Sequence, residues 1–303
     1  MSLRVVVGAG ATGLATARLL AEQGDRVRLV SRRGTGPAGN ELIETVALDA
    51  TDGAALAEAS QGAVTVFNCA APAYHLWPQT VPPLFRAILG AAERAGADYV
   101  MLGNLYGYGL VDGPVTEDLP LAATGPKGLV RAQMWQEAEQ AHAAGRLRVT
   151  EVRSGQFLGA GAVSSFSLTV QAPVLSGQLA LVPAALDTPT GYTSIGDAAR
   201  VLVTVAGDER SFGQPWHAPA TNATVREVAG LLAQAAGAPA PRLEAMTDRD
   251  VALLSLTLPL WGELAETAHM SHHPFVVDSS RIAKLLGLEP TPLGDVFREL
   301  LAP

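Results

Sequence analysis

The 303-residue sequence contains a single cysteine, Cys69, so it can form no disulfide within the chain and no thiolate metal cluster. Cys69 lies in an apolar stretch that is typical of a buried strand end. The near absence of cysteine suits a reducing compartment, and we expect a cytoplasmic protein.

Basic residues are also in short supply. Lys and Arg together number 21 against 29 for Asp and Glu, which gives a formal net charge of −8, and no run of basic residues occurs. A general binder of the phosphate backbone needs many cations on one surface. We therefore expect no nucleic-acid partner.

Long apolar runs are missing as well. The longest stretch without charge, residues 154–186, is interrupted by Gly, Pro, Ser and Gln, whereas a helix that crosses lipid needs about 20 mostly apolar residues. From Met1 the chain passes almost directly into Val5-Val6-Val7, which leaves no room for the basic and apolar regions of a signal peptide. We expect neither a membrane partner nor secretion.

What the sequence does contain is an alternation of short β-branched runs and longer helical periods up to about residue 152. This alternation is typical of a parallel sheet with crossover helices, and so predicts an α/β fold with a Rossmann-type doubly wound parallel sheet. The predicted strands are residues 3–7, 26–30, 42–47, 64–68, 99–102 and 148–152. The predicted helices are residues 12–23, 52–60, 82–95 and 127–144.

Beyond residue 152 the alternation weakens into a Gly-, Pro- and Ser-rich region. Helical patterns return at residues 195–206, 225–236, 248–256 and 279–286. We predict a dinucleotide-binding domain over residues 1–153 and a smaller C-terminal α+β substrate lobe over residues 154–303. Some segments, such as residues 190–206, are expected to be able to return to the first domain.

A glycine turn joins the first predicted strand to the first helix. Gly8, Gly10 and Gly13 have the spacing in which one glycine makes the turn, the next admits a pyrophosphate, and the third allows close helix packing. Ala11 and Thr12 lie at the start of the helix, whose positive end would face the anion. The turn predicts an NAD(P)-type dinucleotide site, and the alternative is a merely tight turn.

The end of the second strand bears on the choice of cofactor. An acidic residue there would bind the ribose 2′-hydroxyl, and a basic residue would pair with a 2′-phosphate. The strand runs into Ser31, Arg32 and Arg33, with no carboxylate. We expect NADP, with NAD possible, because a guanidinium pairs well with a phosphate. The alternative is that both arginines belong to a solvated turn.

Two further segments are candidates for contact with the cofactor. Asp49 follows the third strand and is placed to face the adenine, while Asp52 is placed to begin the next helix. Ala70 and Ala71 follow the fourth strand, where small side chains would let the backbone lie against the cofactor. Packing alone also explains these small residues.

Several motifs occur in an order that resembles the extended or atypical short-chain dehydrogenase/reductase superfamily, which contains the NAD-dependent epimerases and dehydratases. Besides the glycine turn, Asp49 and Asp52, they are Asn68-Cys69-Ala70-Ala71, Leu105-Tyr106-Gly107, residues 153–159, residues 192–200, Asp278-Ser279-Ser280-Arg281 and Leu286-Gly287. The resemblance covers most of the chain. It implies an NAD(P)-dependent enzyme that acts on a small molecule.

The catalytic motif of that superfamily is altered in this chain. The superfamily uses Tyr-x-x-x-Lys on a helix, in which the lysine lowers the tyrosine pKa, and a Ser or Thr that holds the substrate oxygen. At the matching spacing this chain has Lys127 and Arg131, and Leu102-Gly103-Asn104 stands where the hydroxyl residue belongs. The usual proton relay is therefore absent.

A lysine four residues before an arginine is similar to the isoflavone-reductase-like branch of atypical reductases, in which a lysine acts in place of the tyrosine. A lysine serves as acid or base near neutral pH only if burial or a cationic neighbour lowers its pKa, and Arg131 acts in that direction. We predict Lys127 as the catalytic residue, assisted by Tyr106 or Asn104. The alternative is a solvated lysine at a helix start.

Other polar residues are weaker candidates. Tyr74 and His75 follow the fourth strand, and Tyr108 follows the fifth, at the edge where α/β sheets bind ligands. Three histidines, His269, His272 and His273, lie close together in the sequence. No cysteine or acidic pair near them completes a metal site, so no metal is expected. The four tryptophans are interpreted as packing residues.

The function predicted from these features is an NAD(P)-dependent oxidoreductase of the atypical short-chain type. Its substrate is expected to be a small neutral organic molecule, because residues 154–186 offer no charge to pair with an anion. The chain could also form a homodimer. The alternatives are an epimerase or dehydratase that retains its cofactor, and a non-catalytic NAD(P)-binding redox sensor.

Overall fold

The computed structural model describes residues 1–302, which form two compact units. Unit 1 contains residues 1–107, 126–153 and 198–216, and unit 2 contains the remaining described residues. The chain thus passes between the units several times. The division into separate domains at residues 153 and 154 stays a prediction.

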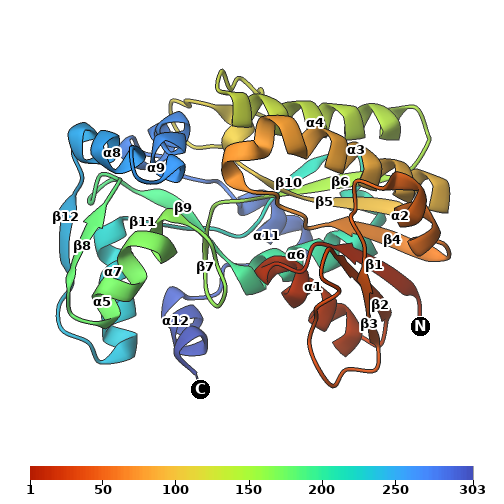
Figure 1. Ribbon diagram of the computed structural model, residues 1–303, viewed down its shortest axis with the longest axis horizontal. Helices are drawn as coiled ribbons and strands as arrows, with labels where there is room; N and C mark the ends of the chain where they lie inside the picture. Colours follow the sequence, from red (N-terminus) through yellow and green to blue (C-terminus); the bar gives the residue numbers. More distant parts are fainter. Residues whose placement is uncertain (303) are drawn as a thin grey trace. The chain divides into compact units, whose positions relative to one another are not determined.

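Unit 1 is built on a seven-stranded sheet in the order β10-β6-β5-β4-β1-β2-β3 (Figure 1). The strands are β1 Leu3–Val7, β2 Arg26–Ser31, β3 Ile43–Ala47, β4 Ala63–Asn68, β5 Asp98–Asn104, β6 Val149–Ser154 and β10 Pro215–His217. The pairs β3·β2, β2·β1, β1·β4 and β4·β5 are parallel, so the carboxyl ends of these strands share one edge. The fold is the predicted Rossmann-type sheet, whose strand order reverses direction between β1 and β4.

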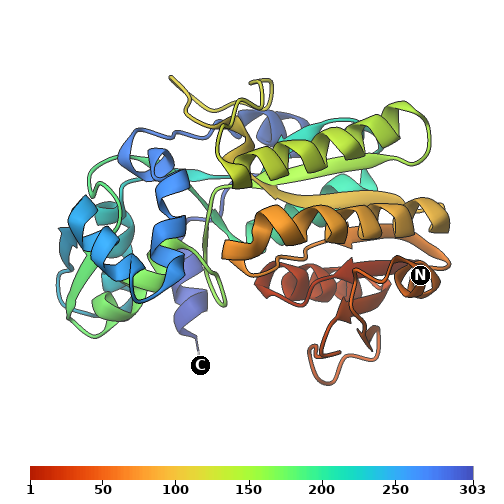
Figure 2. The same cartoon turned by 45° about the horizontal axis from the view of Figure 1, so that its top comes forward.

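Helices cover both faces of this sheet. They are α1 Ala11–Glu22, α2 Gly53–Ala59, α3 Trp77–Ala95, α4 Pro126–Ala143 and α6 Ile195–Gly207, with short 3-10 turns η1 Tyr74–Leu76, η2 Tyr106–Tyr108 and η4 Glu209–Ser211. Helices α2, α3 and α4 lie side by side on one face, and α1 and α6 lie on the other (Figures 1 and 2). Right-handed crossovers place α1 on the face opposite α2, α3 and α4, because the chain moves along the sheet in opposite directions from β1 and from β3.

The strands form where apolar residues run without interruption. Val5, Val6 and Val7 of β1 are fully buried, as are Val66 and Phe67 of β4. Helices cover both faces, so a central strand has no solvent side and needs no alternation of polar residues.

The helix predicted over residues 82–95 begins five residues earlier, at Trp77. Pro78 lies in its first turn, where a missing N–H costs nothing, but Pro82 and Pro83 lie inside the helix and each removes a backbone donor. This pair resembles a helix start in the sequence, which explains the wrong boundary. The earlier start of the helix places Trp77 in its first turn, beside the carboxyl edge of the sheet.

Unit 2 has smaller sheets and shorter helices. The strands form the sets β11-β9-β7 and β12-β8, from β7 Gln156–Leu158, β8 Leu179–Val182, β9 Thr190–Ser194, β11 Thr221–Ala223 and β12 Arg242–Ala245. The helices are α5 Ala172–Leu175, α7 Val225–Ala236, α8 Asp248–Ser255, α9 Pro259–Glu263, α10 His269–His272, α11 Ser280–Leu286 and α12 Leu293–Leu301; η5 Ala265–Thr267 is a 3-10 turn and η3 Ser167–Gln171 is a π-helical turn. A core that includes Tyr192, Leu232 and Phe297 joins the strands of unit 2 to α5, α7 and α12. Within residues 1–302, no helix has the length and apolar character needed to cross a bilayer.

Candidate functional site

The glycine turn lies between β1 and α1 at the carboxyl edge of the sheet. Gly8 has a positive φ of 109°, and a Cβ there would lie 2.6 Å from the Cys69 carbonyl oxygen. A Cβ on Gly13 would overlap the carbonyl oxygen of Gly8. Both glycines are therefore required by the protein's own packing, which holds α1 close to the strands.

Gly10 differs from the other two glycines of the turn. A Cβ built on Gly10 would meet no protein atom within 4 Å, and its φ of −78° suits any residue. Gly10 is the N-cap of α1, which has no side-chain cap and no acidic residue in its first turn. The small residue thus leaves an open cradle above uncapped N–H groups, which fits a dinucleotide pyrophosphate.

At the end of β2 stands a short polar segment. The Ser31 hydroxyl oxygen is buried without a hydrogen-bond partner, while Arg32 and Arg33 are exposed. Asp49, which follows β3, is exposed, and its carboxylate accepts hydrogen bonds from the Thr51 N–H and hydroxyl at 3.0 and 2.8 Å. These bonds lower the Asp49 pKa, with a smaller contribution from the Arg32 guanidinium.

The loop after β4 forms the next part of the edge. Asn68 is fully buried, and its side-chain amide donates to the Tyr99 hydroxyl at 2.8 Å. Its side-chain oxygen accepts from the N–H of Ala70 at 3.2 Å, so Asn68 fixes the backbone on which Ala70 and Ala71 lie. Cys69 is buried between these residues, and burial raises the pKa of its thiol to about 12, which keeps it neutral.

Lys127 lies in the first turn of α4 and is only 1% exposed. Its Nζ lies 4.7 Å from the centroid of the Tyr74 ring, a distance at which a ring face attracts an ammonium group. The alternative of a solvated lysine is therefore wrong. The only other lysine in the sequence, Lys284, is exposed on α11.

Arg131 follows one helical turn later and is also buried. Its Cζ lies 4.4 Å from the Trp77 ring and 5.2 Å from the Phe85 ring, and Nη1 donates to the Leu102 carbonyl at 3.3 Å. Its Nε is buried without a hydrogen-bond partner. Burial lowers the Arg131 pKa.

Tyr106 lies beside Tyr74 and Trp77, and these three residues form an aromatic wall. Its ring lies 6.4 Å from the Tyr74 ring and 5.9 Å from the Trp77 ring, and the Tyr74 hydroxyl is 3.5 Å from its own. Burial raises the pKa of Tyr106 well above its usual value, so the hydroxyl stays protonated. The Asn104 side-chain oxygen accepts from the Tyr106 N–H at 3.2 Å and so fixes the turn.

The structure thus brings the predicted residues Lys127, Tyr106 and Asn104 into the same part of unit 1, together with two residues whose part in the wall the sequence did not reveal. These are Tyr74, considered only as an edge residue, and Trp77, interpreted as packing. The signal that could have found them is their position just after β4, at the same edge as the glycine turn.

Two of the weaker candidates take no part in this wall. His75 is exposed on η1, and the Tyr108 hydroxyl is 2.7 Å from Nε2 of the buried His217 in unit 2. In the part of the chain that the structure describes, no three metal-binding side chains group together, and this includes the histidines of α10.

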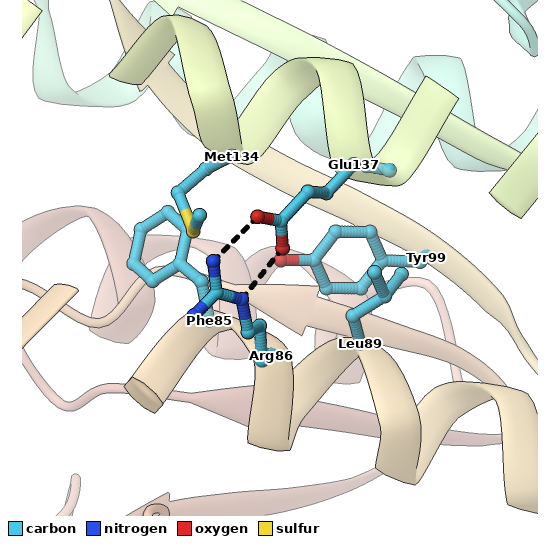
Figure 3. A pocket seen from close by; sticks show the side chains of 7 residues that line it. Phe85, Arg86, Leu89, Tyr99, Met134 and Glu137 are labelled. Carbon is cyan, nitrogen blue, oxygen red and sulfur yellow. Dashed lines mark hydrogen bonds and ion pairs between the residues drawn. The ribbon is translucent and has the colours of Figure 1, made fainter. Parts of the chain in front are cut away.

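A hollow lies between α3 and α4 (Figure 3). Phe85, Tyr99 and Met134 line it beside the Arg86–Glu137 ion pair, whose N–O distances are 2.7 and 2.6 Å. The hollow has room for about one water molecule. It is therefore too small for an organic substrate.

Solved structures with this fold include epimerases and a dehydratase. The epimerase Mth375 from Methanothermobacter thermautotrophicus is 18% identical with a TM-score of 0.81, over 99% of this chain and 90% of that one. The UDP-glucose 4-epimerase from Thermotoga maritima is 17% identical with a TM-score of 0.78, over 99% and 97%. The dTDP-glucose 4,6-dehydratase DesIV from Streptomyces venezuelae is 20% identical with a TM-score of 0.77, over 98% and 96%.

Sequence comparison gives the family. No curated protein sequence matches the chain. A sequence model described as the NAD dependent epimerase/dehydratase family, however, matches residues 5–216, which include the glycine turn, the aromatic wall and both cations of α4. The chain therefore belongs to the NAD-dependent epimerase/dehydratase family of enzymes.

Proposed function

We propose that this chain is an NADP-preferring oxidoreductase of the atypical short-chain type, in which Lys127 transfers the proton. The observation that carries the proposal is the burial of Lys127 against the Tyr74 ring, at the position of the family's tyrosine. Burial of a charged side chain costs free energy, so a lysine that serves only solubility stays exposed to water. The substrate we propose is a small neutral carbonyl compound.

The residues of the edge fit a dinucleotide. Gly10 and the first N–H groups of α1 would hold the pyrophosphate, and the loop fixed by Asn68 would lie along the cofactor at Ala70 and Ala71. Asp49 is proposed to face the adenine. The bound cofactor would supply the hydride, and the protein supplies position and proton.

The preference for NADP is proposed on three neighbouring residues. Arg32 and Arg33 are exposed cations at the end of β2, where a carboxylate would repel a 2′-phosphate. The Ser31 hydroxyl is buried without a partner and could donate to the same phosphate. Charge-assisted hydrogen bonds of this kind are stronger than neutral ones.

The proton step is assigned to residues of the aromatic wall. Lys127 would give its proton to the substrate oxygen during reduction and take one from the alcohol during oxidation. Tyr106 keeps its proton and so would act as a hydrogen-bond donor to the same oxygen. Asn104 would act by holding the Tyr106 turn.

The test is NADPH consumption with a panel of ketones, enones and aldehydes, using the wild-type protein and Lys127→Ala. Turnover by the wild type that Lys127→Ala loses supports the proposal, and Lys284→Ala is the matched lysine control. Tight cofactor binding without turnover on the whole panel would instead favour a redox sensor.

A second candidate is an epimerase or dehydratase that oxidises and re-reduces its substrate on a retained cofactor. Solved structures of a UDP-glucose 4-epimerase and a dTDP-glucose 4,6-dehydratase share this fold over nearly their whole length, which favours the candidate. Incubation with UDP-glucose and dTDP-glucose separates the two, because an epimer or a keto sugar would form without net consumption of NADPH.

A further inference from the structure

Strand β6 carries a buried ion pair on one face. Glu151 and Arg153 stand two residues apart and are 1% and 3% exposed, and the Arg153 Nε donates to the Glu151 carboxylate at 2.7 Å. Removing two charges from water is costly, and such a pair often stabilises a fold no better than apolar residues. Stability alone is thus a weak reason for a carboxylate here.

The neighbouring strand β5 leaves space for this carboxylate. A Cβ built on Gly103 would lie 2.7 Å from Cδ and 2.9 Å from Cγ of Glu151. These distances are shorter than any real contact, so the Glu151 side chain occupies the place of a side chain at residue 103. Its carboxylate therefore lies over β5 at the Leu102-Gly103-Asn104 segment, which stands where the family has its hydroxyl residue.

A second guanidinium, on α4, interacts with the charge of the same carboxylate. Arg131 donates to the carbonyl of Leu102, the residue next to Gly103. Burial lowers the Arg131 pKa, and the Glu151 charge is the strongest influence that opposes this change. Burial raises the pKa of Glu151, and Arg153 and Arg131 both oppose it. One buried carboxylate thus interacts with two buried cations.

Arg131 connects this carboxylate to the aromatic wall. The guanidinium stacks 4.4 Å from the Trp77 ring, and Trp77 packs edge-on against Tyr74 with centroids 5.1 Å apart. Tyr74 is the ring on which Lys127 lies. A series of interactions therefore leads from the Glu151 charge through Arg131 and Trp77 to Tyr74 and the proposed proton donor.

We propose that Glu151 is a positioning residue, which holds Arg131 against Trp77 and so fixes the rings that place Lys127. Its effect on turnover rests on the proposed function, but its effect on Trp77 does not. Without the carboxylate, Arg131 would lose a buried counter-charge, and the guanidinium would move off the Trp77 ring.

Tryptophan reporters test this directly. The four tryptophans give four ¹⁹F resonances after labelling with fluorotryptophan, and Trp→Phe variants assign them. Glu151→Gln is expected to shift the Trp77 resonance, and also that of Trp135, because the Arg153 Cζ lies 5.7 Å from the Trp135 ring. The resonances of Trp216 and Trp261 should stay in place.

Two variants keep the test decisive. Gly103→Ala displaces the carboxylate without changing any charge, and should shift the Trp77 resonance in the same way even if Glu151→Gln does not fold. Glu137 lies on α4, as Arg131 does, and forms an exposed ion pair with Arg86 of α3 (Figure 3). Glu137→Gln is therefore the control, and it should leave the Trp77 resonance unmoved.

The kinetic measurement adds a second readout. Glu151→Gln and Gly103→Ala are expected to lower kcat about tenfold or more, with Glu151→Asp recovering part of the loss. A Trp77 resonance that stays unmoved in Gly103→Ala, while that of Trp135 shifts, would overturn the proposal, since Glu151 would then serve Arg153 alone. If the wild type turns over no substrate but Trp77 responds, the proposed function fails and the positioning role stands.

Discussion

Lys127 and Arg131 stand one helical turn apart on α4, and both side chains are buried against the aromatic rings of the segment that follows β4. Two cations at this spacing repel each other, and burial removes the water that would screen them. The arrangement therefore has an electrostatic cost. Such costs are concentrated at functional sites, where they set the reactivity of a group.

The first prediction concerns Lys127. Lys127→Met keeps the length of the side chain and removes its proton, so we expect kcat for carbonyl reduction to fall by about 100-fold or more, with cofactor affinity within a few-fold of wild type. Steady-state kinetics and NADPH titration measure both. Lys284→Met, on the exposed lysine, should behave as wild type. An active Lys127→Met protein would remove Lys127 from the mechanism.

The second prediction concerns cofactor choice. Arg32→Ala should weaken NADPH binding by roughly 10- to 100-fold, the size of one or two charge-assisted hydrogen bonds, and leave NADH binding nearly unchanged. Ser31→Asp should go further and reverse the preference, because a carboxylate repels the 2′-phosphate and binds a 2′-hydroxyl. Titration calorimetry with both cofactors checks this, with Arg18→Ala on the exposed face of α1 as control. Equal losses for NADH and NADPH would contradict it.

The sheet of unit 1 could be predicted because short β-branched runs alternate there with longer helical periods. The six strands predicted there are all present, with ends that differ by at most two residues. The short strands of unit 2 were not predicted. Strand β9 is fully buried but reads Thr-Gly-Tyr-Thr-Ser, and β11 has only three residues. Their burial depends on neighbours from distant parts of the chain, which no local pattern contains.

In the site, too, only the part formed by neighbouring residues of the chain could be predicted from the sequence. The glycine turn is local, so its spacing and flanking strand were sufficient to predict it. The surroundings of Lys127 come from Tyr74, Trp77 and Tyr106, which parallel strands bring to one edge. Glu151 is harder still, because a charged residue in a strand is normally a sign of a solvent face, whereas β6 is buried throughout.

The third prediction separates two glycines of the turn. Gly10→Ala should fold with wild-type thermal stability, since the added Cβ meets no protein atom, but it should lose cofactor affinity by about tenfold or more because the methyl enters the pyrophosphate cradle. Gly13→Ala should lower the melting temperature, because its Cβ overlaps the Gly8 carbonyl. Calorimetric melting and cofactor titration of both variants test this pair. A Gly10→Ala protein that binds NADPH normally would place the pyrophosphate elsewhere.

The fourth prediction concerns Cys69 and pH. Burial raises its thiol pKa to about 12 from a reference value of 9.0, so the folded protein holds the proton more tightly than the unfolded chain. This contribution to stability is complete below about pH 9 and is lost as the pH rises toward 12, because only the unfolded chain then releases the proton.

Cys69→Ala removes this titration but also leaves a small cavity, so the comparison must be between slopes rather than absolute stabilities. Urea unfolding of both proteins at several values between about pH 8 and pH 11 should give a steeper fall of unfolding free energy for the wild type. A thiol reagent should also react with the wild type only after unfolding, because the reactive species is the thiolate. Parallel slopes, together with rapid labelling of the folded protein, would mean that Cys69 is accessible and that the loop fixed by Asn68 opens in solution.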